Sequence, residues 1–370
     1  MSSAIPMTVL TGYLGSGKTT LLKRLLADPA MSGTAVIINE FGAEGLDDAL
    51  IEKTDEDTVL LPSGCVCCTV RGDLVAALAK LHKQSMWGEI PPMRRIVLET
   101  TGLADPTPIV HTLMTDESVY RIYQLDGVVT TVDAEHGLAE LDRAFEPAKQ
   151  IAIADRIVMT KTDLVAPAIV ARLEGRVRAL NRAAEILRVV KGDVAPARLI
   201  GLGAHEPALA GSDANAWLAD DRHAAPAAHA PHVHGPDCGH DPHEHDLACE
   251  PGCDHPDHHH GHLHGVASYS LVFDEPLDGN ALSLALQTMA TAYGDKLLRV
   301  KGIATVEGQS KPFVVHGVQH IFYPPDVLAD WPRRADGERD KRSRFVFITR
   351  DLPEASVRKH LQTFLGDARR

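Results

Sequence analysis

Short apolar runs alternate with helical patterns through residues 1–200. The runs are rich in valine and isoleucine and are bounded by glycine, proline or aspartate, which is typical of strands buried in a parallel sheet. Leu74, Leu78 and Leu81 recur at helical spacing, and helices are expected over 18–27 and 70–81. The predicted strands cover residues 7–10, 35–38, 58–61, 95–98, 127–132, 156–159 and 185–190. The pattern predicts an α/β fold whose mostly parallel sheet is covered on both faces.

The pattern changes at residue 205. Residues 205–264 are dominated by alanine, proline, glycine, histidine and aspartate, and almost no large aliphatic side chain follows Leu218. Such a segment cannot bury enough apolar surface to offset its chain entropy, so a disordered linker is expected there. We therefore expect a first domain over residues 1–204 and a linker over 205–264.

Residues 265–370 regain regular patterning and predict a smaller α+β domain. Helices are expected to begin at Asp278 and Pro353. The stretch 333–344 carries six basic and three acidic residues and is expected to be a solvated loop, with a docking site for a partner as the alternative. The predicted strands lie near residues 267–273, 303–306, 313–316 and 345–348.

Composition adds a signal for metal binding. The chain has 370 residues with 20 histidines, of which 13 lie between His223 and His264, and its six cysteines fall into two groups of three. The formal net charge is −13, which disfavours nucleic acid or an anionic membrane as the main partner. No apolar run reaches the ~18–20 residues of a membrane span. No basic residue precedes Lys18, so no secretory signal is expected and the chain is predicted to be cytoplasmic.

Residues 12–19 read G-Y-L-G-S-G-K-T, follow a predicted strand and open a predicted helix. This context is typical of a P-loop, in which backbone N–H groups surround a β-phosphate. Lys18 is expected to bridge the β- and γ-phosphates, and the Thr19 hydroxyl is expected to bind Mg²⁺. The expected phosphate-binding residues are Gly12, Gly15, Ser16, Gly17, Lys18, Thr19 and Thr20.

Two further strand ends carry candidate nucleotide-binding groups. Glu99 ends an apolar strand and is expected to hold Mg²⁺ or position water, while the Gly102 N–H is expected to sense the γ-phosphate. The sequence T-K-T-D over Thr160, Lys161 and Asp163 follows another strand. A carboxylate at Asp163 can accept hydrogen bonds from guanine N1–H and its amino group, which adenine does not offer, so GTP is expected rather than ATP.

Cys65, Cys67 and Cys68 lie within four residues, next to a predicted helix start. Thiolates select Zn²⁺, Co²⁺ or Cu(I), and three of them leave one tetrahedral position open. A redox pair and buried structural cysteines are the alternatives. Glu40, in an N-E-F-G segment before the cysteines, is a candidate Mg²⁺ contact or a further metal ligand, or else a solvent-facing loop residue.

The histidine-rich tract is expected to be a metal reservoir, with a solvated linker as the alternative. Its imidazoles and thiolates have no preset geometry, and protons should compete for them near pH 6.5. Candidate ligands are His232, His234, Cys238, His240, Cys249, Cys253, His255, His258, His259, His260, His262 and His264.

Together these motifs resemble the CobW-type metallochaperone GTPases, relatives of HypB and UreG. The resemblance rests on the P-loop, N-E-F-G, G-C-V-C-C, E-T-T-G-L-A-D-P and T-K-T-D, and on L-L-R-V-K-G and G-V-Q near the C-terminus. It implies a P-loop GTPase domain and a CobW-type C-terminal domain, with GTP, Mg²⁺ and Zn²⁺ or Co²⁺ as ligands. It also implies slow GTP hydrolysis that controls delivery of the metal to a client protein.

Three functions stay open at this point. The first is the GTP-driven metallochaperone, with the client docking on the C-terminal domain and a nucleotide- or metal-dependent dimer as an open alternative to a monomer. The second is a histidine-rich metal storage protein with a regulatory nucleotide site. The third is a P-loop small-molecule kinase, which Asp163 and the lack of an obvious acceptor pocket disfavour.

Overall fold

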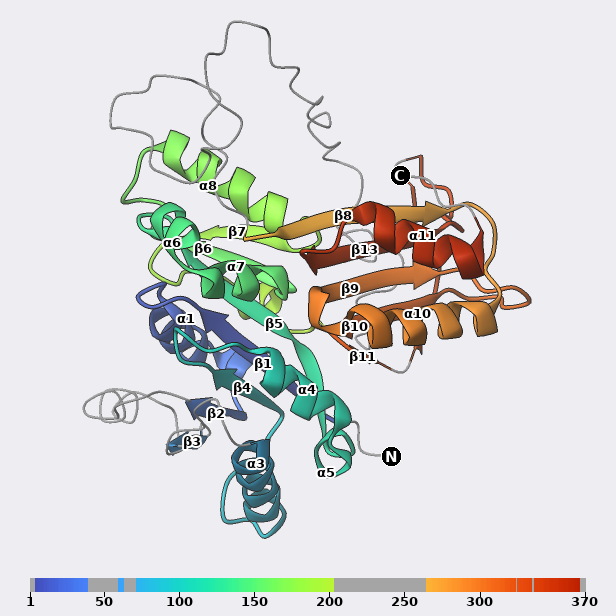
Figure 1. The fold of residues 1–370 in the computed structure, drawn as a ribbon. Coiled ribbons are helices and arrows are strands. Elements are labelled where there is room, and N and C mark those ends of the chain that lie inside the picture. The colour runs from blue at the N-terminus through green and yellow to red at the C-terminus, as the bar shows by residue number, and fades with distance from the viewer. Residues whose placement is uncertain are drawn as a thin grey trace, which may run out of the picture.

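The computed structural model describes residues 4–38, 59–62, 71–202, 264–323, 325–334 and 336–366. The described residues from 4 to 202 build one sheet and those from 264 to 366 build another, and we refer to them as the N-terminal unit and the C-terminal unit (Figure 1). The strands of the first sheet are β1 (Ile5–Gly12), β2 (Thr34–Ile38), β3 (Val59–Pro62), β4 (Arg95–Glu99), β5 (Tyr123–Asp133), β6 (Arg156–Thr160) and β7 (Glu185–Val189).

The seven strands of the first sheet are all parallel and lie in the order β3-β2-β4-β1-β5-β6-β7. After β1 the chain forms β2, β3 and β4 on one side of β1, and then β5, β6 and β7 on the other side. The strand order therefore reverses beside β1, and the carboxyl ends around such a reversal form the crevice in which α/β proteins bind ligands. The pairing places Leu10 opposite Glu99 and Gly12 opposite Thr131, so the predicted motifs meet at this edge.

Helices cover both faces of this sheet because its strands carry apolar side chains on both sides. In β4, Ile96 and Leu98 pack with the cluster around α3 and α4, whereas Val97 faces the opposite side and packs with α1. In β6, Met159 likewise packs with the cluster of α7 and α8, and Val158 packs with that of α1. The helices are α1 (Lys18–Leu26), α3 (Arg71–Met86), α4 (Thr107–Thr115), α5 (Glu117–Tyr120), α6 (Gly137–Arg143), α7 (Phe145–Ala152) and α8 (Pro167–Leu180).

The second sheet is antiparallel, with the order β11-β10-β9-β13-β8 and β12 paired to β10. Its two long helices pack on one face, where Leu286 of α10 and Leu361 of α11 join one apolar cluster (Figure 1). The Asp278 side chain accepts a hydrogen bond of 2.7 Å from the Ala281 N–H and caps α10, as predicted. The elements are β8 (Val266–Phe273), α10 (Gly279–Tyr293), β9 (Leu297–Ala304), β10 (Phe313–Val318), β11 (Ile321–Phe322), β12 (Asp326–Val327), β13 (Ser343–Arg350) and α11 (Glu354–Leu365).

The predicted fold class is confirmed, and two local expectations hold only in part. The strand expected at 303–306 is β9, which already begins at Leu297. The sequence pattern missed its first half because Arg299 and Lys301 interrupt the apolar run, although both side chains are buried. The stretch 333–344 is not simply a solvated loop. Asp340 is only 2% exposed and accepts a 2.8 Å hydrogen bond from the Arg342 guanidinium.

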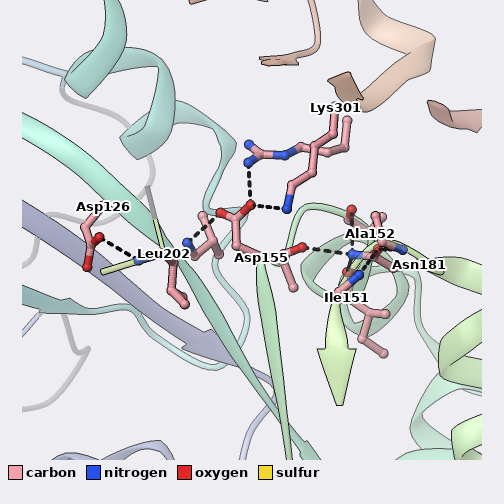
Figure 2. A network of polar contacts seen from close by, with 12 residues as sticks. Asp126, Ile151, Ala152, Asp155, Asn181, Leu202 and Lys301 are labelled. Carbon is pink, nitrogen blue, oxygen red and sulfur yellow. Dashed lines mark hydrogen bonds and ion pairs between the residues drawn. The ribbon is translucent and has the colours of Figure 1, made fainter. Parts of the chain in front are cut away.

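The face of β9 away from its helices meets the N-terminal unit. Arg299 and Lys301 both reach Asp155, which lies between α7 and the start of β6; the shortest N–O distances are 2.6 Å and 2.8 Å. Figure 2 shows Lys301 and Asp155 pointing toward each other. Nearby, Asn181 donates to the carbonyls of Ile151 and Ala152 at 2.8 and 3.2 Å and fixes the end of α7. In the parts of the chain described here, no helix is both long and apolar enough to cross a membrane.

Candidate functional site

The loop between β1 and α1 curves back over the carboxyl edge of the first sheet. Gly12 has a positive φ of 144°, and a β-carbon there would lie 2.2 Å from the Thr131 hydroxyl oxygen. Only glycine therefore lets the loop approach β5 so closely. The Ser16 hydroxyl lies 2.7 Å from the same Thr131 oxygen and donates to the Tyr13 carbonyl, also at 2.7 Å. These contacts hold the loop in place without a ligand.

Lys18 and the N-terminus of α1 point into this loop. The Lys18 ammonium donates to the carbonyls of Gly12 and Tyr13, both at 3.0 Å, and the side chain is buried. Gly17 precedes α1 and offers no side chain to cap the first N–H groups of the helix. A helix N-terminus attracts anions through these N–H groups and the helix dipole. The loop thus combines a buried cation and backbone donors, which suits a polyphosphate.

Glu99 and Thr19 meet beside the loop. The Thr19 hydroxyl donates to Glu99 Oε1 at 2.7 Å, and Glu99 is only 5% exposed at the end of β4. Hydroxyl and carboxylate oxygens are the hard ligands that Mg²⁺ prefers, alongside water and phosphate oxygens. The two residues fit a magnesium site, and Mg²⁺ bound there would neutralise charge on the phosphate oxygens.

Gly102 lies directly against the P-loop. A β-carbon at Gly102 would lie 2.7 Å from the backbone nitrogen and the α-carbon of Leu14, so no side chain fits. The segment that follows Glu99 therefore packs on the loop that is built to hold phosphate. This placement is the one the γ-phosphate-sensing prediction requires.

The T-K-T-D motif follows β6 at the same edge. Asp163 is exposed and accessible to a base. The Thr160 hydroxyl donates to the Ser16 carbonyl at 2.8 Å and so braces the P-loop. Lys161 has a positive φ of 55°, and its ammonium donates to Asp133 at 2.7 Å. Asp133 at the end of β5 thus fixes Lys161, two residues before Asp163.

Comparison with known proteins agrees with this geometry. Residues 6–188 match the CobW/HypB/UreG nucleotide-binding domain, and residues 266–365 match the cobalamin synthesis protein CobW C-terminal domain. The chain is also 30% identical over 354 residues to "Zinc chaperone YjiA" of Escherichia coli, covering 96% of both chains. The chain belongs to the CobW/HypB/UreG family.

Two further comparisons with this CobW-family chain are informative. The chain is 32% identical over 247 residues to "Zinc-regulated GTPase metalloprotein activator 1" of Saccharomyces cerevisiae. This alignment covers 59% of this chain and 57% of the relative. The crystal structure of Zn(II)-bound YjiA GTPase from E. coli superposes with a TM-score of 0.66 at 28% identity. It covers 98% of this chain and 99% of that one, so the similarity extends through both units.

Several predicted residues of this CobW-family chain lie outside the described residues. These are Glu40, the three cysteines of the C-V-C-C segment and all the candidate ligands of the histidine-rich tract except His264. His264 lies just before β8, and its Nε2 donates to the Leu141 carbonyl at 2.8 Å. That nitrogen holds the C-terminal unit against the N-terminal unit, which leaves only Nδ1 for a metal.

Sequence reasoning missed the residues that support the site from behind. Asp133 and Gln150 contact the T-K-T-D motif and the segment after Glu99, respectively. Each is a single polar residue without a local pattern, so only the packing identifies it. Asp133, Glu135 and His136 also place their ligand atoms within 4.8 Å of one another, but Asp133 is already paired with Lys161.

Proposed function

We propose that this protein is a GTP-hydrolysing metallochaperone that binds a transition metal, zinc first and cobalt next, and delivers it to a client protein under GTP control. The observation that carries the proposal is the meeting of Lys18, Glu99 and Gly102 around one P-loop, next to the T-K-T-D motif. Relatives named zinc chaperone and zinc-regulated GTPase activator support the choice of cargo.

Each part of the chain has its own role in this proposal. The first domain, residues 1–204, holds the nucleotide and the C-V-C-C metal site, and residues 205–264 supply metal-binding capacity. The C-terminal domain, residues 265–370, receives the client. Thiolate ligands require a reducing compartment, which favours the cytoplasm. A dimer that depends on nucleotide or metal is compatible with this division.

Hydrolysis follows from the positions of the described side chains. With GTP bound, Lys18 would donate to phosphate oxygens in place of the two loop carbonyls it now contacts. Glu99 and Thr19 would hold Mg²⁺, whose charge stabilises the phosphate oxygens. The Gly102 N–H would meet the γ-phosphate. As in GTPases that await a partner protein, turnover by this chain alone is expected to be slow.

The metal–nucleotide coupling is tested by anaerobic titration of Zn²⁺ and Co²⁺ with and without Mg²⁺ and a non-hydrolysable GTP analogue. We expect the analogue to raise Zn²⁺ affinity about tenfold, because loops ordered by the γ-phosphate would also order the thiolates. Cys67→Ser should remove this coupled site. Deletion of residues 223–264 should lower only the number of metal ions bound. An unchanged Zn²⁺ affinity would favour the storage protein instead.

Base recognition is tested by Asp163→Asn. The amide can no longer accept hydrogen bonds from both guanine N1–H and the amino group, so GTP affinity should fall about tenfold. Xanthosine triphosphate carries a carbonyl oxygen where guanine has its amino group, and the new amide can donate to it. The variant should therefore prefer this nucleotide in competition assays. Unchanged discrimination between GTP and ATP would show that Asp163 does not read the base.

A further inference from the structure

Gln150 of α7 lies beneath the segment that follows β4. Its side chain is 1% exposed, and its Nε2 donates to the carbonyls of Gly102 and Ala104 at 3.2 and 3.0 Å. The backbone carbonyl of Gln150 accepts a 2.8 Å hydrogen bond from the Thr130 hydroxyl of β5. Both the backbone and the amide of this residue are therefore fixed, the first to the sheet and the second to the segment above.

The orientation of the amide follows from its partners. Both contacts are carbonyl oxygens, which only accept hydrogen bonds, so the NH₂ group must face them. The Gln150 Oε1 is then left buried without a hydrogen-bond partner among the described residues. A buried acceptor without a partner is unfavourable for folding, so its presence points to a functional reason for the amide.

The neighbouring residue holds the same segment. The Lys149 ammonium pairs with Asp105 Oδ2 at 2.5 Å, and Asp105 Oδ1 accepts a 3.0 Å hydrogen bond from the Thr107 N–H at the start of α4. On the opposite side the segment rests on Leu14 of the P-loop. Residues 102–105 are thus held between the phosphate-binding loop and two consecutive side chains of α7.

We propose that Gln150 is a positioning residue for recognition of the γ-phosphate. It holds the carbonyls on both sides of the Gly102–Ala104 turn, so that the Gly102 N–H is presented to a γ-phosphate without reorganisation. A donor held in place before the ligand arrives costs nothing to order on binding. GDP lacks the γ-phosphate and does not use this contact. The proposal rests on the GTPase function proposed above and adds the residue that makes the site distinguish GTP from GDP.

The test compares Gln150→Met, which keeps length and volume but has no donor, with Thr130→Val. The control removes the hydroxyl that holds the Gln150 backbone and leaves the amide contacts in place. Binding of fluorescent GDP and of a non-hydrolysable GTP analogue is measured for each purified full-length variant. Single-turnover hydrolysis and thermal unfolding are measured alongside.

Gln150→Met should weaken binding of the GTP analogue about tenfold, which corresponds to about 1.4 kcal/mol. The affinity for GDP should change less than about twofold. The hydrolysis rate at saturating GTP should fall by a similar factor. Thr130→Val should change neither the ratio of GTP-analogue affinity to GDP affinity nor the hydrolysis rate. Equal losses for GDP and the analogue, or no loss for either, would overturn the positioning role. If Gln150→Met does not fold, Gln150→Glu keeps the shape and takes its place. If the wild-type chain itself hydrolyses no GTP, the proposed function fails, whereas the binding ratio still tests this inference.

Discussion

Replacing Asp155 with alanine is expected to lower the free energy of unfolding by about 3–5 kcal/mol, because it leaves two buried cations without their anion. Asp155 is 5% exposed, and its partners Arg299 and Lys301 are 3% and 2% exposed. The second carboxylate oxygen of Asp155 accepts a 2.9 Å hydrogen bond from the Val128 N–H. Urea unfolding of the full-length protein measures the change.

The dependence on pH follows from the same contacts. Burial raises the pKa of Asp155, but the charges of Arg299 and Lys301 outweigh it and hold the pKa well below its ordinary range. A carboxyl group whose pKa is lowered by folding contributes stability above its unfolded pKa, near 4. That contribution is lost as the pH falls toward the folded value. The difference in stability between the wild type and Asp155→Asn should therefore stay constant above about pH 5 and shrink below about pH 4.

The three charges of this cluster should not contribute equally. Burial lowers the pKa of Lys301, and the attraction of Asp155 offsets this only in part, so the surroundings disfavour the lysine charge. Lys301→Met should then cost about 1 kcal/mol or less, since Arg299 still neutralises Asp155. Asp142→Ala is the matched surface control, because its pair with Arg176 leaves the carboxylate 45% exposed. It should change stability by less than about 1 kcal/mol. A loss for Asp155→Ala no larger than that of the control would contradict the prediction.

The nucleotide-binding edge was predictable because its motifs are local in sequence. The strand pattern placed Gly12, Glu99 and Asp163 at carboxyl ends of parallel strands, and parallel strands bring such ends together. The contact of the Thr160 hydroxyl with the Ser16 carbonyl, 144 positions earlier, has no counterpart in the motif. A local motif identifies which loop a residue belongs to, whereas its hydrogen-bond partner depends on the packing of distant strands.

The supporting contacts were not predictable for the same reason. Gln150 and Gly102 are 48 positions apart, and Asp155 and Arg299 are 144 positions apart. One signal was present nevertheless: Arg299 and Lys301 stand two residues apart in an otherwise apolar run, so they share one face of a strand. Two cations on a buried face require a buried anion from elsewhere. That argument predicts a partner such as Asp155 without identifying it.

The supporting contacts also connect the two units. Gln150 holds the segment next to the P-loop, and Asp155, which holds β9 of the C-terminal unit, follows five positions later on the same stretch of chain. Asp155 stands at the amino end of β6 and Thr160 at its carboxyl end, about 16 Å away at ~3.3 Å per residue. Movement of α7 relative to the sheet would therefore shift both the segment after β4 and the contact of Asp155 with β9.

Replacing Glu99 with glutamine is expected to reduce GTP hydrolysis at saturating GTP by about 100- to 1000-fold, the range found when one group that stabilises transition-state charge is removed. The substitution keeps the shape of a buried side chain and can preserve the 2.7 Å hydrogen bond from Thr19 through its carbonyl oxygen. It removes the negative charge and replaces the second carboxylate oxygen with an NH₂ group. The fold should therefore survive, which circular dichroism and thermal unfolding would verify.

The distinguishing result is the dependence on Mg²⁺. If Glu99 helps to hold the ion, the variant should need a much higher Mg²⁺ concentration for half-maximal activity, while GDP binding in EDTA stays at the wild-type value. Glu117→Gln is the control, because that carboxylate is 66% exposed in a surface pair with Arg121 and lies far from the P-loop in sequence. If Glu99→Gln instead keeps its Mg²⁺ dependence and loses only the rate, Glu99 acts on the attacking water and not on the ion. An unchanged rate would remove Glu99 from the site altogether.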